Sequence, residues 1–198
     1  MLSFLPVLLL AVSLDTPAMA DSDGSVYCDA VYQTRNGRTF RVSVTCPDVE
    51  HRESLQRQAE QQVEEARSVL RDVSIRDLPG RVHFRRVETA NGVDWQVQPG
   101  VISRINAYYP RNPVRANVSA ACTARYDIVE GEPENICIVC RATDFRGDYI
   151  REMRRAIRRS FFVDTSEPVE QVFSVEFPLP DAPSPGIPPA PDCSEDSE

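Results

Sequence analysis

CDAVYQTRNGRTFRVSVTC, residues 28–46, has a second copy in CTARYDIVEGEPENICIVC, residues 122–140. Both stretches open with Cys-x-Ala-x-Tyr, carry Gly nine residues after the first Cys, and close with Cys eighteen residues after it. Two cysteines, a tyrosine and a turn glycine rarely recur at the same offsets by chance. The chain therefore contains an internal repeat, and the repeat decides the architecture.

Each copy has the pattern of a β-hairpin, in which alternate residues of both strands share one face. A two-residue turn at Asn36-Gly37 would leave Cys46 on the wrong face, because a shift of one residue reverses every side chain of a strand. We therefore expect one extra residue in each loop, with the shared glycine, Gly37 or Gly131, in the left-handed conformation. The residues expected on the common faces are Cys28, Ala30, Tyr32, Phe40, Val42, Val44 and Cys46, and then Cys122, Ala124, Tyr126, Ile128, Ile136, Ile138 and Cys140.

Six cysteines, an even number, favour disulfides in an exported chain. Equal spacing and matching faces predict the pairs Cys28–Cys46 and Cys122–Cys140. Cys137 is then either free or tied to Cys193. The Cys137-x-x-Cys140 motif lies in a strand, where residues i and i+3 face opposite sides, so we expect neither a metal site nor a redox site there.

A helix is predicted after each hairpin, because apolar residues recur every three or four positions. Asp48 and Asp148 are expected to cap the two helices. The apolar faces are Leu55, Ala59, Val63, Ala66 and Leu70 in the first helix, and Ile150, Met153, Ile157 and Phe161 in the second.

A strand follows each predicted helix, at residues 81–87 and at residues 169–177. The predicted fold is α+β: two ββαβ units with antiparallel sheets, each with a helix packed on one face. Between them we expect a strand at Val93–Val97 and a short helix starting at Pro110. The expected division is a signal peptide at 1–20, an N-terminal unit at 21–98, a second unit at 99–179 and an extended, Pro-rich acidic tail at 180–198.

The first 20 residues resemble a secretory signal peptide. Their apolar run, Phe4 to Leu14, is too short to span a bilayer, which needs about 20 residues. Ala18-Met19-Ala20 is typical of a cleavage site. Cleavage after Ala20 is expected, and an uncleaved inner-membrane anchor is the alternative. The net charge of −8 argues against nucleic acid as a partner, since phosphate binding needs a basic surface.

The stretch YPRNPVRANVSAACTARYDI, residues 109–128, resembles the C-terminal domain of the TonB family. That family shows a Tyr-Pro pair, a short helix, a glycine seven residues after the proline, a second small residue and a strand ending in aromatic-Asp-aliphatic. The matching residues are Tyr109, Pro110, Asn117, Ala120, Tyr126, Asp127 and Ile128. Asn117 replaces the family glycine, and Ser160 stands where the family usually has Trp. The resemblance covers about residues 101–179, and the first unit is read as a degenerate copy.

The resemblance implies a periplasmic, non-enzymatic protein that binds a partner's extended segment by strand pairing. The implied partner is an envelope protein or an outer-membrane transporter peptide, with a link to TonB-dependent transport. The implied contact residues are Tyr109, Pro110, Gln171, Val172, Phe173, Ser174 and Val175. The alternatives are an inner-membrane energy transducer, a thiol-redox envelope protein and a purely structural envelope protein. The family's long Pro-rich spacer before the domain is missing here, which disfavours the transducer.

The remaining candidate residues carry no recognisable chemistry. His51 falls in the first predicted helix and His83 in a strand, and neither can be placed near a serine or an acid. The arginine cluster is interpreted as a solvated helix face, and binding of an acidic partner or of the acidic tail is the alternative. Its members are Arg151, Arg154, Arg155, Arg158 and Arg159. No catalytic set, phosphate loop, cofactor or small-molecule substrate is predicted.

Overall fold

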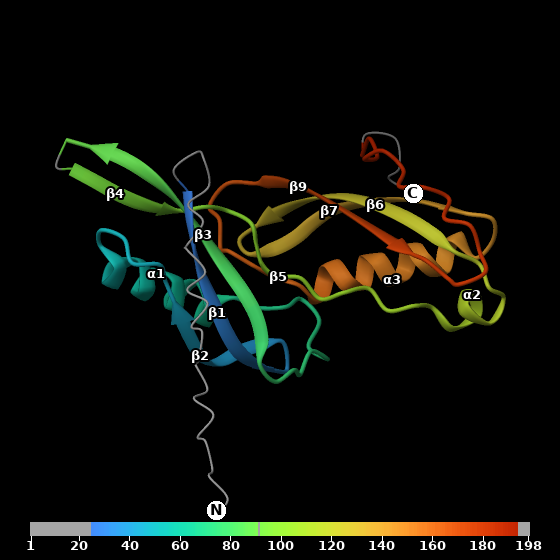
Figure 1. The fold of residues 1–198 in the computed structure, drawn as a ribbon, viewed down its shortest axis with the longest axis horizontal. Helices are drawn as coiled ribbons and strands as arrows, with labels where there is room; N and C mark the ends of the chain where they lie inside the picture. The colour runs from blue at the N-terminus through green and yellow to red at the C-terminus, as the bar shows by residue number, and fades with distance from the viewer. Residues whose placement is uncertain (1–24, 91, 194–198) are drawn as a thin grey trace, which may run out of the picture.

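The structure, a computed structural model, describes residues 25–90 and 92–193. The expected signal segment, residues 1–20, lies outside the described residues. Two sheets lie beside one another, each with a helix against one face (Figure 1). Within the described part of the chain, no helix is long and apolar enough to cross a bilayer.

The structure confirms the α+β class with antiparallel sheets. The first unit contains β1 (Ser25–Arg35), β2 (Arg38–Thr45), α1 (Arg52–Glu65), β3 (Leu78–Thr89) and β4 (Gly92–Val97), with the sheet order β2-β1-β3-β4. The second contains α2 (Arg111–Arg115), β6 (Ala120–Val129), β7 (Glu132–Ala142), α3 (Arg146–Arg159) and β9 (Val169–Phe177), with the order β7-β6-β9. The strand expected at Val93–Val97 is β4, which pairs with β3 and extends the first sheet.

The register of each hairpin is set by a bulge in the return strand, so the expectation of a longer loop is wrong. Both turns hold two residues, Asn36-Gly37 and Glu130-Gly131. The extra residue lies opposite the repeat tyrosine, where Arg41 in the first copy and Asn135 in the second have φ of 52° and 50°. A bulge adds one residue to one strand, which restores the match between the two cysteines.

Disulfides Cys28–Cys46 and Cys122–Cys140 close the hairpins, in the two pairs that the repeat predicts. Their Cα–Cα distances of 4.2 and 4.1 Å are those of narrow, non-hydrogen-bonded pairs in an antiparallel ladder. The third disulfide joins Cys137 to Cys193. Three disulfides are typical of proteins that fold outside the reducing cytoplasm.

The predicted helix caps are wrong. The residue before α1 is His51 and the residue before α3 is Phe145, with φ of 64° and 55° and no side-chain cap hydrogen bond. Capping by a side chain needs an extended backbone, and both positions are left-handed instead. Asp48 therefore lies outside α1, and Asp148 lies inside the first turn of α3, where it pairs with Arg151.

The apolar helix faces are buried as predicted, but both end sooner than expected. In α1, Leu55, Ala59 and Val63 are fully buried, and the helix stops at Glu65. Ala66 and Leu70 thus follow in a loop rather than on the helix. In α3, Met153 and Ile157 are buried against the second sheet.

A short two-stranded sheet joins the two units. It pairs β5 (Val101–Ser103), which follows the first sheet, with β8 (Phe161–Phe162), which follows α3. The loop after α1 also meets the end of α3, where the Ser68 hydroxyl donates to the carbonyl of Arg158 at 2.9 Å. The joint between the units therefore does not use β9.

The two phenylalanines of β8 point into different cores. Phe161 belongs to the first core and contacts Tyr32 edge-on, with ring centroids 5.7 Å apart. Phe162 belongs to the second core and contacts Tyr126 edge-on at 5.9 Å. Tyr32 and Tyr126 are the repeat tyrosines, so the repeat extends to the packing. The prediction that Phe161 continues the face of α3 is wrong, because the helix ends at Arg159 and the strand that follows alternates its side chains.

The described part of the Pro-rich tail lies on the second sheet, on the face away from α3. The Thr123 hydroxyl, on the outer face of β6, donates to the carbonyl of Pro188 at 2.6 Å. The Ser119 hydroxyl donates to the carbonyl of Ala182 at 3.2 Å. The disulfide from Cys193 to β7 ties down the far end of this segment.

The two turn glycines share a conformation but not an environment. Gly37 and Gly131 have φ of 72° and 74°. A Cβ on Gly37 would lie 2.9 Å from the carbonyl oxygens of Ser68 and Leu70, whereas the atom nearest a Cβ on Gly131 is the Cα of Asp164 at 3.6 Å. The loop after α1 therefore wraps the first turn closely and leaves no room for a side chain.

We expect Gly37→Ala to destabilise the protein more than Gly131→Ala. The left-handed backbone costs alanine about 1–2 kcal/mol at either turn. Overpacking adds about 1–3 kcal/mol at residue 37 alone. Urea unfolding with the disulfides intact measures both variants, and equal losses would contradict the close approach.

Phe161→Ala and Phe162→Ala form a second matched pair. Truncating a buried phenylalanine costs about 3–5 kcal/mol. Because neighbouring residues fill different cores, Phe161→Ala should lower amide-exchange protection mainly in β1 and α1, and Phe162→Ala mainly in β6 and α3. An identical protection pattern in both variants would argue against this division.

Candidate functional site

Strand β9 has one partner and one open edge. It pairs with β6 over its whole length, from Val169 opposite Ile128 to Phe177 opposite Ala120. Among the described residues, no other strand pairs with it. Its second edge therefore presents backbone groups that another strand could use.

The disulfide geometry decides which backbone groups of β9 point outward. Cys122 and Cys140 are a narrow pair with a Cα–Cα distance of 4.1 Å, so the backbone N–H and C=O of Cys122 point away from β7 and toward β9. Val175, opposite Cys122, thus bonds to β6. Because direction alternates along a strand, the groups pointing to the open edge belong to Glu170, Val172, Ser174 and Glu176.

The inner side of β9 is supported by the segment between β5 and α2. The guanidinium of Arg104 lies 4.0 Å from the ring centroid of Phe173 and 3.5 Å from the hydroxyl of Tyr126. Burial raises the pKa of Tyr126, and the nearby charge of Arg104 opposes that rise only in part. Phe173 and Val175 pack against the second core. This side of the edge is therefore apolar, with one cation.

The residues implied by the TonB resemblance fall along this edge and at its end. Gln171, Val172, Phe173, Ser174 and Val175 are consecutive in β9, and the Val172 side chain is 48% exposed. The Tyr109 hydroxyl donates to the carbonyl of Pro178 at 3.1 Å, and its ring meets Phe177 edge-on at 5.5 Å. Pro110 comes just before α2. The structure thus brings Tyr109 to the C-terminal end of β9.

The outer side of β9 borders the tail. The Ser174 hydroxyl lies 3.0 Å from that of Thr123, which in turn holds Pro188. The Ser184 hydroxyl donates to the carboxylate of Glu176 at 3.2 Å. Thr123 and Ser184 were not singled out from the sequence. The sequence feature that could have predicted this tail contact is the run of small residues on both faces of β6, which indicates a strand covered on both sides.

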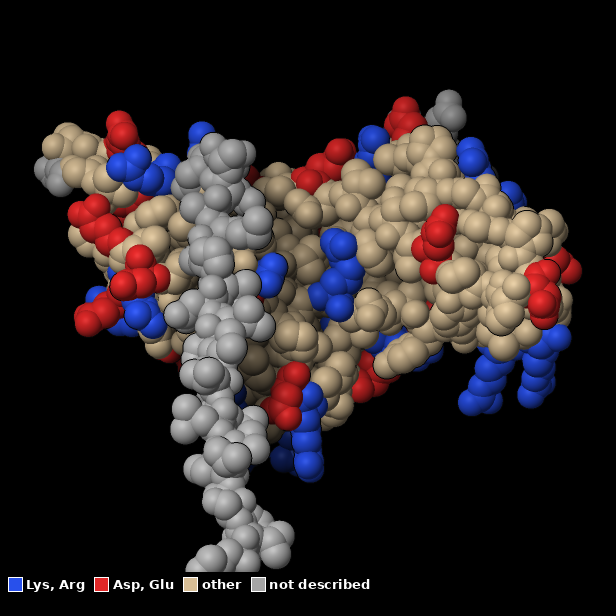
Figure 2. Space-filling view, viewed as in Figure 1, with Lys and Arg blue, Asp and Glu red and all other residues tan. Residues whose placement is uncertain are grey.

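Charge is distributed unevenly over the visible face. In Figure 2 the first unit, on the left, carries interspersed basic and acidic side chains, whereas much of the second unit is uncharged. A single ion pair, Arg125 with Glu170 at 3.8 Å, joins β6 to the start of β9. The middle of β9 is thus mainly apolar and uncharged.

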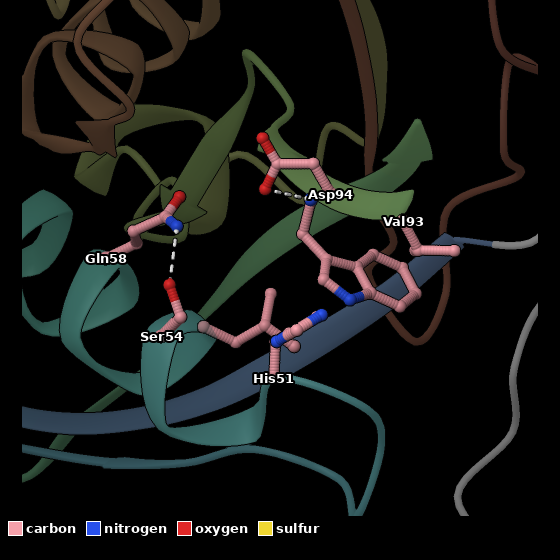
Figure 3. Close-up of a pocket in the computed structure, with 7 residues that line it drawn as sticks. His51, Ser54, Gln58, Val93 and Asp94 are labelled. Carbon is pink, nitrogen blue, oxygen red and sulfur yellow. Dashed lines mark hydrogen bonds between the residues drawn. The ribbon is translucent and has the colours of Figure 1, made fainter. Parts of the chain in front are cut away.

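A small pocket of about 130 Å³ lies between the start of α1 and β4 (Figure 3). It brings Ser54 and Asp94 near His51, a grouping that the sequence does not reveal because a loop and the whole of β3 separate α1 from β4. Their contacts are separate. His51 Nε2 lies 3.5 Å from Glu50, the Ser54 hydroxyl accepts from Gln58, and Asp94 accepts from the N–H of Trp95. No hydrogen bond among the described residues links the three into a nucleophile and base.

The cysteine motif is divided between two disulfides. Cys140 pairs with Cys122 on the core side of β7, and Cys137 pairs with Cys193 on the other side. Within the described ranges, no group of three His, Cys, Asp or Glu side chains could hold a metal ion. His83 lies in β3, with its ring 6.0 Å from that of Tyr27.

Comparison with protein-family models, with curated proteins and with solved structures finds no match to this chain.

Proposed function

We propose that the protein is an exported, periplasmic binding protein that captures an extended segment of another envelope protein at the edge of β9. The observation that carries the proposal is the open edge, along which Glu170, Val172, Ser174 and Glu176 direct their backbone groups outward. Strand addition at a sheet edge obtains affinity from backbone hydrogen bonds and specificity from side-chain positions. The resemblance to the TonB C-terminal domain supports the same strand, and an outer-membrane transporter peptide is the partner it implies.

The surroundings of the edge predict the chemistry of the partner segment. Alternate side chains of an added strand would lie beside Phe173 and Val175 on the inner side. There they would meet apolar surface and the guanidinium of Arg104. On the outer side they would lie beside Val172 and Ser174, next to the tail. A segment with apolar residues at alternate positions and one acidic residue near Arg104 fits these neighbours.

The three disulfides support export, because such bonds persist in oxidising compartments. The periplasmic location and the link to TonB-dependent transport rest on the resemblance and on the signal-like N-terminus. The proposed role is binding. The thiol-redox alternative is disfavoured because the two cysteines of the C-x-x-C motif lie on opposite faces of β7.

Ser174→Pro tests the edge directly. Proline removes an N–H that points outward and leaves the bonds between β9 and β6 in place, and edge strands tolerate it. We expect the variant to keep its fold and disulfides but to lose crosslinks formed by a photoreactive residue at Val172 in intact envelopes. Mass spectrometry identifies the crosslinked protein.

Ser174→Ala is the matched control, because it removes the hydroxyl and keeps the backbone N–H. It should crosslink as the wild type does. Loss of the crosslink in both variants would assign the effect to the side chain. Persistence of the crosslink in Ser174→Pro, with a circular dichroism spectrum like the wild type, would refute binding through this edge.

A further inference from the structure

A row of three arginines crosses the first sheet at the end of its hairpin. Arg35 pairs directly with Arg38 across the turn, and Arg38 forms an isolated antiparallel bridge with Arg67. Residues directly opposite one another share a face of the sheet. The neighbouring Thr39 hydroxyl donates to the carbonyl of Val63 in α1, so the arginine row lies on the face away from the helix.

The repulsion between these arginines should destabilise the folded protein when no ligand is bound. Directly opposite residues have Cβ atoms about 4.5–5.5 Å apart, and like charges there are destabilising. No described carboxylate forms an ion pair with any of the three. Of the acids nearest along the chain, Glu65 accepts from Gln61 at 3.0 Å and Asp72 pairs with Arg159 at 3.2 Å, while Glu64 forms no ion pair with a described residue. The repulsion therefore has no internal compensation, although the chain carries a net charge of −8.

The row borders a concave site. Arg35, Asn36, Arg38 and Arg71 line an open pocket of about 630 Å³ at the hairpin tip. The backbone beneath it is held in place, since the N–H of Gly37 donates to the carbonyl of Val73 at 3.0 Å. The arginines therefore stand on a defined surface.

We propose that this pocket binds a phosphate-bearing anion. A carboxylate has two oxygens and accepts one pair of parallel N–H hydrogen bonds, a fork, from a single guanidinium group. A phosphate or diphosphate presents oxygens on several sides and can take forks from three or four arginines at once. Arginines converging from β1, β2 and the loop after α1 match the second arrangement. The ligand is either a free phosphate compound or the headgroup of an anionic lipid, which share this chemistry.

The site is independent of the β9 edge, because it lies in the other unit and uses side-chain charge. Removing one central arginine also relieves repulsion in the empty protein. The proposal therefore predicts two effects of opposite sign, loss of ligand binding and a gain in stability, which a general folding defect would not produce.

The test uses the purified, disulfide-intact protein and pyrophosphate. Pyrophosphate should raise the thermal midpoint of the wild type, and the rise should shrink as salt increases. Arg38→Gln should raise the midpoint without ligand and abolish the pyrophosphate shift. In calorimetric titration, the double variant Arg35→Gln/Arg38→Gln should bind pyrophosphate at least tenfold more weakly than the wild type.

Arg154→Gln is the matched control, since Arg154 is an exposed arginine of α3 with no ion pair to a described residue. It should keep the wild-type pyrophosphate shift. Row-dependent binding to phosphatidylglycerol vesicles without a pyrophosphate shift would assign the site to lipid headgroups. A pyrophosphate shift that is present and equal in wild type and Arg38→Gln would overturn the proposal, and so would binding of neither pyrophosphate nor the vesicles. The proposal would also be overturned if the wild type bound polyglutamate, the arginine variants did not, and neither pyrophosphate nor the vesicles bound.

Discussion

A cross-strand disulfide at the same position of both hairpins sets the register on which the rest of the structure depends. Cys28–Cys46 and Cys122–Cys140 join narrow, non-hydrogen-bonded pairs, with Cα–Cα distances of 4.2 and 4.1 Å. A two-residue turn alone would put the cysteines out of phase, and one bulged residue corrects this. Once the register is set, the direction of each backbone group in the neighbouring strands follows, including those on the open edge of β9.

The same register also positions the two tyrosines that contact the connection between the units. It places Tyr32 and Tyr126 on the core faces, opposite the two bulges. Phe161 and Phe162 then meet one tyrosine each, because successive residues of a strand point in opposite directions. Two adjacent residues after α3 thus contribute to two cores. The first core is thus completed by Phe161, a residue of the second half of the chain.

The two proposed binding surfaces depend on different interactions. The β9 edge offers backbone hydrogen bonds beside an apolar face, and such contacts respond weakly to salt. The arginine pocket at Arg35, Arg38 and Arg71 acts through charge, which salt screens over about 10 Å at 0.1 M. The chain as a whole is acidic, so the attraction of the pocket for anions is local. Salt dependence therefore separates the two activities experimentally.

The sequence by itself determined the features that depend on local pattern. Strand periodicity predicted β9 at residues 169–177, and repeat spacing predicted the two hairpin disulfides. The role of Gln171 to Val175 as contact residues rests on the resemblance alone and stays a prediction. Whether that strand has a free edge could not be predicted, because the answer depends on which other strands lie beside it.

Only the tertiary structure decided the features that join distant residues. These are the bulges at Arg41 and Asn135, the separation of Phe161 from Phe162, the path of the tail to Cys137, and the bridge between Arg38 and Arg67. Local propensity does not contain this information. A bulge, a shared core or a charge row exists only after chain segments many residues apart have packed together, and its free energy comes from that packing.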